Sequence, residues 1–205
     1  MQLNIFTVLI FALFAEGHSL KCYQCTGLLG PCEKKETTCP SGDAVCASQM
    51  TVQFNGAAST NIPIKSCLEP KMCFDGSVNY GIIRTTTTTQ CCNTDLCNSR
   101  DVSDSSSNNL NGKQCYYCEK DSCFNKLSCL GSEDHCIKTK VNSESLSVTI
   151  KGCASKSMCD AASQMSQVYA DVSCCEGNLC NSAKSITQNL LILLSGPFLS
   201  YITFH

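Results

Sequence analysis

Twenty cysteines in a chain of 205 residues constrain this sequence more than any other feature. They form two sets of ten in which the order of short and long gaps is the same. The first set is Cys22, Cys25, Cys32, Cys39, Cys46, Cys67, Cys73, Cys91, Cys92 and Cys97. The second is Cys115, Cys118, Cys123, Cys129, Cys136, Cys153, Cys159, Cys174, Cys175 and Cys180. Each set opens with C-x-x-C and closes with C-C-x4-C-N-S, which predicts two copies of one module.

The residues between the cysteines repeat as well. Ile64 to Cys73 reads I-K-S-C-L-E-P-K-M-C, and Ile150 to Cys159 reads I-K-G-C-A-S-K-S-M-C. K-C-Y-Q-C, starting at Lys21, matches Q-C-Y-Y-C, starting at Gln114. These matches indicate an internal duplication rather than two unrelated cysteine-rich segments.

The cysteine content is typical of a disulfide scaffold in an exported protein. An even number in each module predicts no free thiol. Adjacent Cys91 and Cys92, like Cys174 and Cys175, should each bond elsewhere, because a bridge between neighbours is strained. C-x-x-C pairs also occur in redox sites and zinc ribbons, but a βαβ context is absent and eight further cysteines per module favour disulfides. We therefore expect neither a metal nor a cofactor.

Charge and histidine content exclude other functions. There are 15 Lys and Arg residues against 17 Asp and Glu, so no dense basic face for nucleic acid is expected. The three histidines are His18, His135 and His205, and the first and last fall in segments that processing should remove. One remaining histidine makes a Ser-His-Asp or Cys-His catalyst improbable, and we expect no enzyme.

The first nineteen residues have the pattern of a signal peptide. Ile5 to Ala15 is an apolar run apart from Thr7, and it is too short to span a bilayer. Small residues follow at Gly17 and Ser19. We expect cleavage after Ser19, with cleavage after Gly17 as the alternative, so that residues 1–19 are removed. A buried N-terminal helix is the competing interpretation, and the abrupt start of the cysteine-rich part at Cys22 disfavours it.

The other end has the pattern of a glycosylphosphatidylinositol (GPI) attachment signal. Small residues after Cys180 are followed by the polar spacer Lys184 to Asn189 and an apolar tail. We expect the lipid on Asn181, or alternatively on Ser182, and removal of residues 182–205 as a propeptide. A transmembrane helix is the competing interpretation. It would need about 20 apolar residues, whereas this tail is interrupted by Ser-Gly-Pro and has no basic flank after it.

Strands and turns, not helices, are expected within each module. In Cys136 to Cys153, apolar and polar residues alternate, which is typical of a hairpin with one apolar face. Asn142 to Ser145 supplies its turn, and Asn55-Gly56 is the corresponding turn candidate of the first module. Pro63 should weaken ladder pairing there. Thr85 to Thr89 is β-branched throughout and is expected to be a strand.

The modules are joined by a stretch rich in Ser and Asn, Asp101 to Gly112. Its composition is typical of a solvated, flexible connector, with an O-glycosylated or protease-sensitive segment as the alternative. The expected organisation is a first domain at residues 20–98, a linker at 99–112 and a second domain at 113–181.

The cysteine order and the C-C-x4-C-N ending resemble the lymphocyte antigen 6 / urokinase receptor family of three-finger (LU) domains, over both modules. The resemblance implies a small disulfide-rich all-β fold, with tandem three-finger domains and five disulfides each. The implied pairs in the first module are Cys22–Cys46, Cys25–Cys32, Cys39–Cys67, Cys73–Cys91 and Cys92–Cys97. In the second they are Cys115–Cys136, Cys118–Cys123, Cys129–Cys153, Cys159–Cys174 and Cys175–Cys180. The resemblance also implies that Asn98 and Asn181 close the disulfide-rich bases by hydrogen bonding.

Rigid bases with variable loops make binding scaffolds. The implied finger tips are Gly27 to Glu36, Gln53 to Ile62, Asp75 to Arg84, Glu119 to Leu127, Lys140 to Leu146 and Asp160 to Tyr169. Candidate binding residues in them are Leu28, Leu29, Phe54, Phe74, Tyr80, Ile82, Phe124 and Tyr169, each of which could instead pack within its own module.

The expected function is a GPI-anchored, non-catalytic binding module on the outer leaflet of the plasma membrane, a receptor or co-receptor for an extracellular protein. The alternative is a soluble or surface inhibitor of an extracellular phospholipase, protease or ligand-gated receptor, which rests on family analogy alone.

Overall fold

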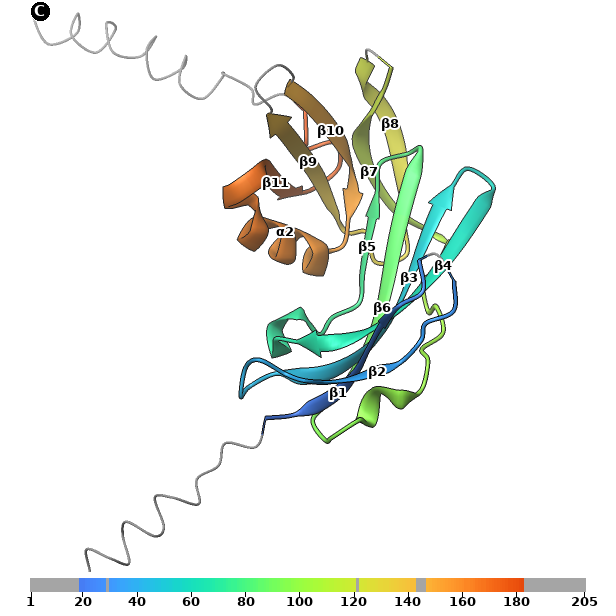
Figure 1. Ribbon diagram of the computed structural model, residues 1–205. Coiled ribbons are helices and arrows are strands. Elements are labelled where there is room, and N and C mark those ends of the chain that lie inside the picture. The colour runs from blue at the N-terminus through green and yellow to red at the C-terminus, as the bar shows by residue number, and fades with distance from the viewer. Residues whose placement is uncertain (1–18, 29, 121, 143–146, 183–205) are drawn as a thin grey trace, which may run out of the picture. The chain divides into compact units, whose positions relative to one another are not determined.

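The computed structural model describes residues 19–182, apart from residues 29, 121 and 143–146 (Figure 1). Residues 1–18 of the predicted signal peptide, residues 183–205 of the predicted propeptide and most of the turn after Asn142 therefore lie outside the described residues. The chain forms two compact units. Of the described residues, unit 1 comprises residues 19–77 and 83–107, and unit 2 comprises residues 78–82 and 108–182.

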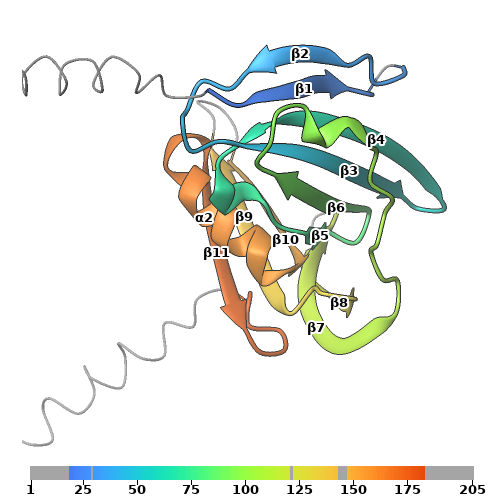
Figure 2. The same cartoon turned by 90° about the horizontal axis from the view of Figure 1, so that it is seen from below.

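Unit 1 is built on antiparallel strands in the order β2, β1, β4, β3 and β6. Their bounds are β1 (Lys21–Thr26), β2 (Lys35–Thr38), β3 (Val45–Asn55), β4 (Ala58–Leu68) and β6 (Ile83–Cys92). Figure 2 shows the β1–β2 hairpin alongside β4 and β3. The β-branched run that predicted a strand forms the centre of β6, which confirms that prediction.

The second finger of unit 1 is a regular hairpin. Gly56 supplies the left-handed turn at φ 61°, and Asn55 pairs with Ala58 across it. Pro63 is expected to weaken the ladder, yet β4 pairs with β3 along its whole length, with Pro63 opposite Met50. The Pro63 carbonyl accepts a 2.8 Å hydrogen bond from Gly27, so the position that lacks an N–H faces away from β3.

Two short 3₁₀ helices complete unit 1, η1 (Pro70–Met72) and η2 (Cys97–Ser99). Unit 2 contains the hairpin of β7 (Leu110–Glu119) and β8 (Ser122–Leu130). It also contains β9 (His135–Asn142), which lies between β10 (Ser147–Ala154) and β11 (Ala170–Glu176). The predicted hairpin within Cys136 to Cys153 is therefore present as β9 and β10.

Part of the third finger of the first module belongs to unit 2. Strand β5 (Gly76–Asn79) pairs there with β10, Asn79 opposite Cys153. A Cβ atom added to Gly152 would lie 2.0 Å from the Asn79 carbonyl oxygen, so only glycine fits beside this strand. The first module has Ser66 at the equivalent position.

One expectation about secondary structure is wrong. Lys156–Tyr169, which includes the predicted loop from Asp160, is an α-helix, α2. Ser155 precedes it, and its hydroxyl accepts a 3.4 Å hydrogen bond from the Met158 amide, the arrangement of an N-cap. Ion pairing between Lys156 and Asp160 at 2.8 Å, one helical turn apart, adds local support. The Ser155 cap and the Lys156–Asp160 pair are local helix signals, which the strand pattern of the rest of the module does not show.

Disulfide-bonded cysteines form the buried cores at the centres of both units. The buried clusters are Cys22, Cys39 and Cys46 in unit 1, and Cys115, Cys129, Cys136 and Cys153 in unit 2. Ten disulfides are present, and they are the ten pairs that the family resemblance implies. Modules this small bury little apolar surface, so these crosslinks must supply much of the stability, by about 2–4 kcal/mol each.

The predicted linker, residues 99–112, is not a free connector over its first half. Val102 is buried in unit 1. Ser105 and Thr88 share a 3.1 Å hydrogen bond between their hydroxyl groups. The linker continues into β7, which begins before the predicted second domain. The serine-rich composition predicted a flexible connector. Composition alone is not sufficient, because serine hydroxyl groups can bond to a neighbouring strand as well as to water.

Candidate functional site

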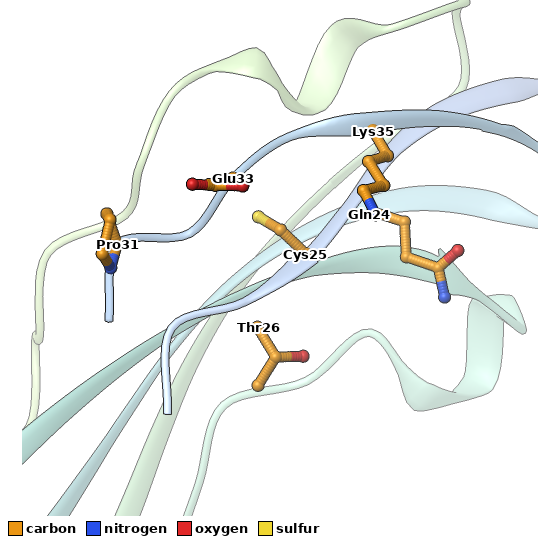
Figure 3. Close-up of a pocket in the computed structure, with 6 residues that line it drawn as sticks. All are labelled: Gln24, Cys25, Thr26, Pro31, Glu33 and Lys35. Atoms are coloured by element: carbon orange, nitrogen blue, oxygen red, sulfur yellow. The ribbon is translucent and has the colours of Figure 1, made fainter. Parts of the chain in front are cut away.

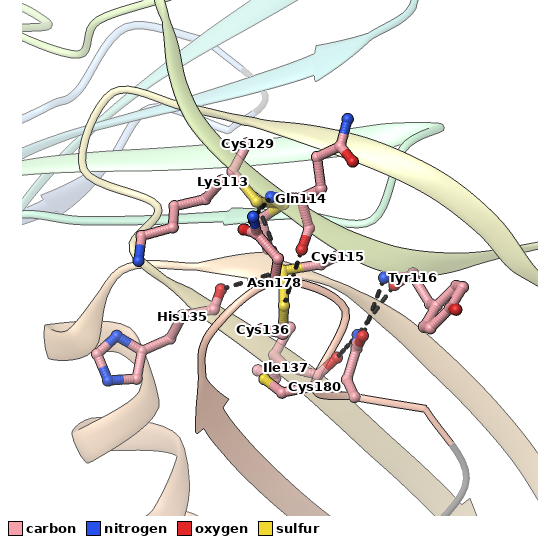
Figure 4. Close-up of a disulfide and its surroundings, with 12 residues drawn as sticks. Lys113, Gln114, Cys115, Tyr116, Cys129, His135, Cys136, Ile137, Asn178 and Cys180 are labelled. Atoms are coloured by element: carbon pink, nitrogen blue, oxygen red, sulfur yellow. Dashed lines mark hydrogen bonds between the residues drawn. A yellow bond between two sulfur atoms is a disulfide. The ribbon is translucent and has the colours of Figure 1, made fainter.

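The base of unit 2 is closed by Asn181, which is almost fully buried. Its side-chain oxygen accepts a 2.9 Å hydrogen bond from the Tyr116 amide, and its Nδ2 donates to the Tyr116 carbonyl at 2.9 Å. The same Nδ2 donates to Ile137 at 3.0 Å and to Gly152 at 3.4 Å. Figure 4 shows this base around the Cys115–Cys136 disulfide. One side chain thus ties three strands together.

Asn98 closes the base of unit 1 in a similar way, by bonding to two strands. It accepts a 2.9 Å hydrogen bond from the Tyr23 amide and donates to the Tyr23 and Ala47 carbonyls, both at 2.9 Å. Both asparagines therefore have the hydrogen-bonding role that the resemblance implies, and Tyr23 and Tyr116 contribute through their backbones.

Each base holds a further feature that the sequence analysis missed. Leu96 and Leu179 both have left-handed backbones, at φ 56° and 60°, which is unusual for leucine. Each amide donates a 2.7 Å hydrogen bond to the carbonyl of the residue before the first cysteine, Lys21 or Gln114. The shared L-C-N-S ending was the signal that could have indicated this turn.

Unit 1 also holds a buried cation. Lys65, on β4, is only 1% exposed, and its Nζ is 2.9 Å from the carboxylate of Asp101. It also donates to the Ser48 hydroxyl at 3.0 Å and to the Arg100 carbonyl at 2.6 Å. Hydrogen bonding to Lys65 lowers the pKa of Asp101 below its usual value. All three N–H donors of this ammonium group are satisfied by the chain itself.

The equivalent lysine of unit 2 is Lys151, on β10, and it is 5% exposed. Its Nζ has one hydrogen bond, 3.4 Å long, to the Cys123 carbonyl. The ammonium lies 5.2 Å from the Phe124 ring centroid and 5.9 Å from that of Tyr116, within range of cation–π attraction. Burial, and then repulsion from Lys138, lower the pKa of Lys151.

A shallow hollow of about 460 Å³ lies on the first finger of unit 1 (Figure 3). It is lined by Gln24, Cys25, Thr26, Pro31, Glu33 and Lys35. The hollow is open and mostly polar, unlike the apolar enclosure that usually holds a small ligand.

The predicted binding residues divide into three groups. Leu28, Ile82 and Phe124 are strongly exposed, at 60%, 60% and 65%. Phe54, Phe74 and Tyr80 are half-buried. Leu29 and the side chain of Tyr169 lie outside what the structure describes. Val148, on β10, and Leu110, on β7, are exposed apolar residues that were not predicted.

His135 lies between two carboxylate groups. Its Nδ1 lies 2.8 Å from Asp134 and its Nε2 lies 3.4 Å from Glu176. Sulfur clusters that could geometrically hold a metal consist of disulfide-bonded cysteines, which offer no thiolate. Among the residues with a described position, no helix is long and apolar enough to cross a bilayer.

Two family models match the chain. A u-PAR/Ly-6 domain matches residues 18–100, and a model described as snake toxin and toxin-like protein matches residues 113–181. The crystal structure of mouse TEX101 is 15% identical with a TM-score of 0.27, and the match covers 71% of this chain and 87% of that one.

Curated relatives include the urokinase plasminogen activator surface receptor of Rattus norvegicus, 30% identical over 185 residues, or 82% of this chain and 56% of the receptor. Lymphocyte antigen 6F of Mus musculus is 36% identical over 98 residues, or 47% of this chain and 70% of that protein. The chain spans about half the length of the urokinase receptors that it matches. These matches cover both modules and agree with the paired disulfide bases, and we conclude that the chain belongs to the u-PAR/Ly-6 family.

Proposed function

We propose that the chain is a GPI-anchored cell-surface module that binds an extracellular protein ligand without catalysis. The observation that carries the proposal is the pair of complete, Asn-closed disulfide bases, each of which holds loops in a fixed geometry. Relatives named as surface receptors support a binding role at the cell surface. Exposed apolar residues on the fingers, such as Leu28 and Phe124, are the kind of anchors that protein interfaces use.

The proposed anchor is a GPI lipid in the outer leaflet, attached at Asn181 or Ser182. Asn181 is buried and held by four hydrogen bonds, whereas Ser182 is exposed. Attachment requires an accessible peptide bond, which supports Ser182 over Asn181. In either case the lipid joins directly after the base of unit 2.

Phosphatidylinositol-specific phospholipase C tests the anchor. Cells that express the full chain should release it into the medium on treatment, and a variant with Leu193→Arg in the apolar tail should fail to reach the surface in anchored form. Mass spectrometry of the released C-terminal peptide identifies the attached residue. Protein that stays on treated cells, or that appears in the medium without treatment, would contradict the anchoring proposal.

A second candidate function is a modulator that occludes an enzyme or a ligand-gated receptor. The match of the second module to snake toxin and toxin-like proteins favours it. Proximity labelling on living cells separates the two: a neighbouring receptor or enzyme whose activity changes when the protein is removed supports the modulator.

A further inference from the structure

The two modules differ at one buried position in a way that points to a ligand. Lys65 and Lys151 are equivalent residues of the I-K-S-C and I-K-G-C repeats. In unit 1, Lys65 lies opposite Ser48 in the ladder, and the hydroxyl group of Ser48 accepts a hydrogen bond from its ammonium group. In unit 2, Lys151 lies opposite Lys138, so a second cation replaces the acceptor.

The anionic partner differs as well. Asp101, three residues after Asn98, supplies the carboxylate that pairs with Lys65. The residue three after Asn181 is Lys184, which has no carboxylate. Residue 184 also falls in the segment proposed to be removed, so unit 2 has a lysine in place of Ser48 and no counterpart of the Asp101 carboxylate.

Lys151 is consequently an under-satisfied buried cation. Two of its three N–H donors have no acceptor within the described part of the chain, and its residue is 95% buried. Burying an ammonium group without an anion is costly, and the nearby Lys138 adds to the cost. A group of this kind gains free energy when an anion reaches it.

The aromatic neighbours define the rest of the surface. Tyr116 and Phe124 pack edge to face with centroids 6.0 Å apart, and the Lys151 ammonium lies against both rings. Phe124 is 65% exposed, and an exposed ring changes rotamer in picoseconds to nanoseconds, so it does not block access. Lys126, directly opposite Tyr116 in the β7–β8 ladder, is exposed and adds positive charge.

We propose that Lys151, Lys138, Tyr116 and Phe124 form a docking surface for an extended segment of an extracellular protein, with an Asp or Glu carboxylate as its central group. The proposal rests on the binding function above and names the chemistry of its partner. The carboxylate of the partner would complement the charge of the two lysines. The exposed ring of Phe124 would contact an apolar side chain next to that carboxylate. Unit 1 shows the same kind of contact within one chain. There the Lys65 ammonium group binds the backbone carbonyl of Arg100 and the carboxylate of Asp101, which follows it.

Two matched phage-displayed peptide libraries test the proposal on the full chain purified from expressing cells. Both carry random residues around a fixed central position, which is Asp in one library and Asn in the other. We expect binders from the Asp library, with apolar residues next to the aspartate, and at least a tenfold loss of their affinity for Lys151→Met.

Control variants separate this site from a general effect of charge. Lys113→Met removes an exposed lysine elsewhere in unit 2 and should leave peptide binding unchanged. Lys138→Asp places a carboxylate opposite Lys151 and should abolish peptide binding by filling the site from within. Disulfide mapping and thermal unfolding establish that each variant is folded.

Three results would overturn the proposal. The Asn library could yield binders as readily, or the peptides could bind Lys151→Met as well as the unchanged chain. Peptides could also bind only a form ending at Ser182, which would mean that the chain's own following segment or its anchor occupies the surface. Each of these results leaves the phospholipase test of anchoring unaffected, so the two proposals can fail separately.

Discussion

Lys65 and Lys151 occupy the same place in two copies of one module, yet their surroundings have diverged. Lys65 is neutralised by Asp101 and bonded to two further oxygens. Lys151 faces two aromatic rings, one distant carbonyl and a second lysine. Meanwhile the asparagines that close the two bases make nearly the same hydrogen bonds.

This divergence indicates which parts of the module can change without loss of the fold. A buried amide that bonds to several strands has no substitute of the same shape, so the base repeats. A lysine on the sheet face needs only some compensation for its charge, and that compensation can come from the same chain or from another molecule.

The largest expected effect is at the asparagines. Asn98→Ala and Asn181→Ala each leave buried carbonyl and amide groups without partners, which should lower the free energy of unfolding by about 3 kcal/mol. We expect greatly reduced surface expression and a lower melting temperature, measured by thermal unfolding of the purified chain.

The matched control is Asn61→Ala, at an exposed position of β4, which should change stability by less than about 0.5 kcal/mol. Equal stability of Asn98→Ala and Asn61→Ala would show that the base does not depend on this side chain.

The lysines themselves should give the next largest effect. Lys65→Met removes three hydrogen bonds and leaves the Ser48 hydroxyl and the Arg100 carbonyl without this partner, so we expect a loss of about 2 kcal/mol. Lys151→Met removes a poorly compensated buried cation and should be neutral or stabilising. Urea unfolding of the two variants measures the difference, and an equal loss at both positions would refute the comparison.

The fold was largely predictable because the cysteines determine it. Their repeated spacing indicated two modules, and the period of two indicated the hairpin between Cys136 and Cys153. Helix α2 was missed because the whole module was assigned to strands, although Ser155 before an Ala- and Met-containing stretch is a helix-start signal.

The candidate site was less predictable for a physical reason. Phe124 was recognised as a loop aromatic, but Lys151 was not singled out, because a lysine in an alternating strand normally points into solvent. Its burial arises from the rings of Tyr116 and Phe124 on the β7–β8 hairpin, a tertiary contact that no local pattern encodes.

A smaller effect is expected at the carboxylate of unit 1. Asp101→Asn weakens the ion pair with Lys65 but keeps a hydrogen-bonding group, and the side chain is 62% exposed, so the loss should be about 0.5 kcal/mol. The lowered pKa of Asp101 means that the native state favours its ionised form. The stabilisation is therefore present above the usual value of 3.8 and lost as the pH falls through the native value. Chemical unfolding at pH 7 and pH 2.5 should show a smaller difference between the two proteins at pH 2.5 than at pH 7.

The smallest effect concerns the pKa of Lys151 rather than stability. Lys138→Ser restores the residue type that faces Lys65 and removes the repulsion, so the pKa of Lys151 should rise toward 10.5 while burial still holds it below that value. In the native protein the lowered pKa means that the unfolded state binds more protons between the native value and 10.5, so stability increases with pH across that window. The substitution should make that increase smaller.

An NMR titration of ¹³C-methylated lysines measures the pKa of Lys151 directly, with Lys113→Ser as the control that leaves it unchanged. If the pKa of Lys151 is unaltered in Lys138→Ser, the two ammonium groups do not interact. The repulsion between paired cations would then not be a difference between unit 2 and unit 1.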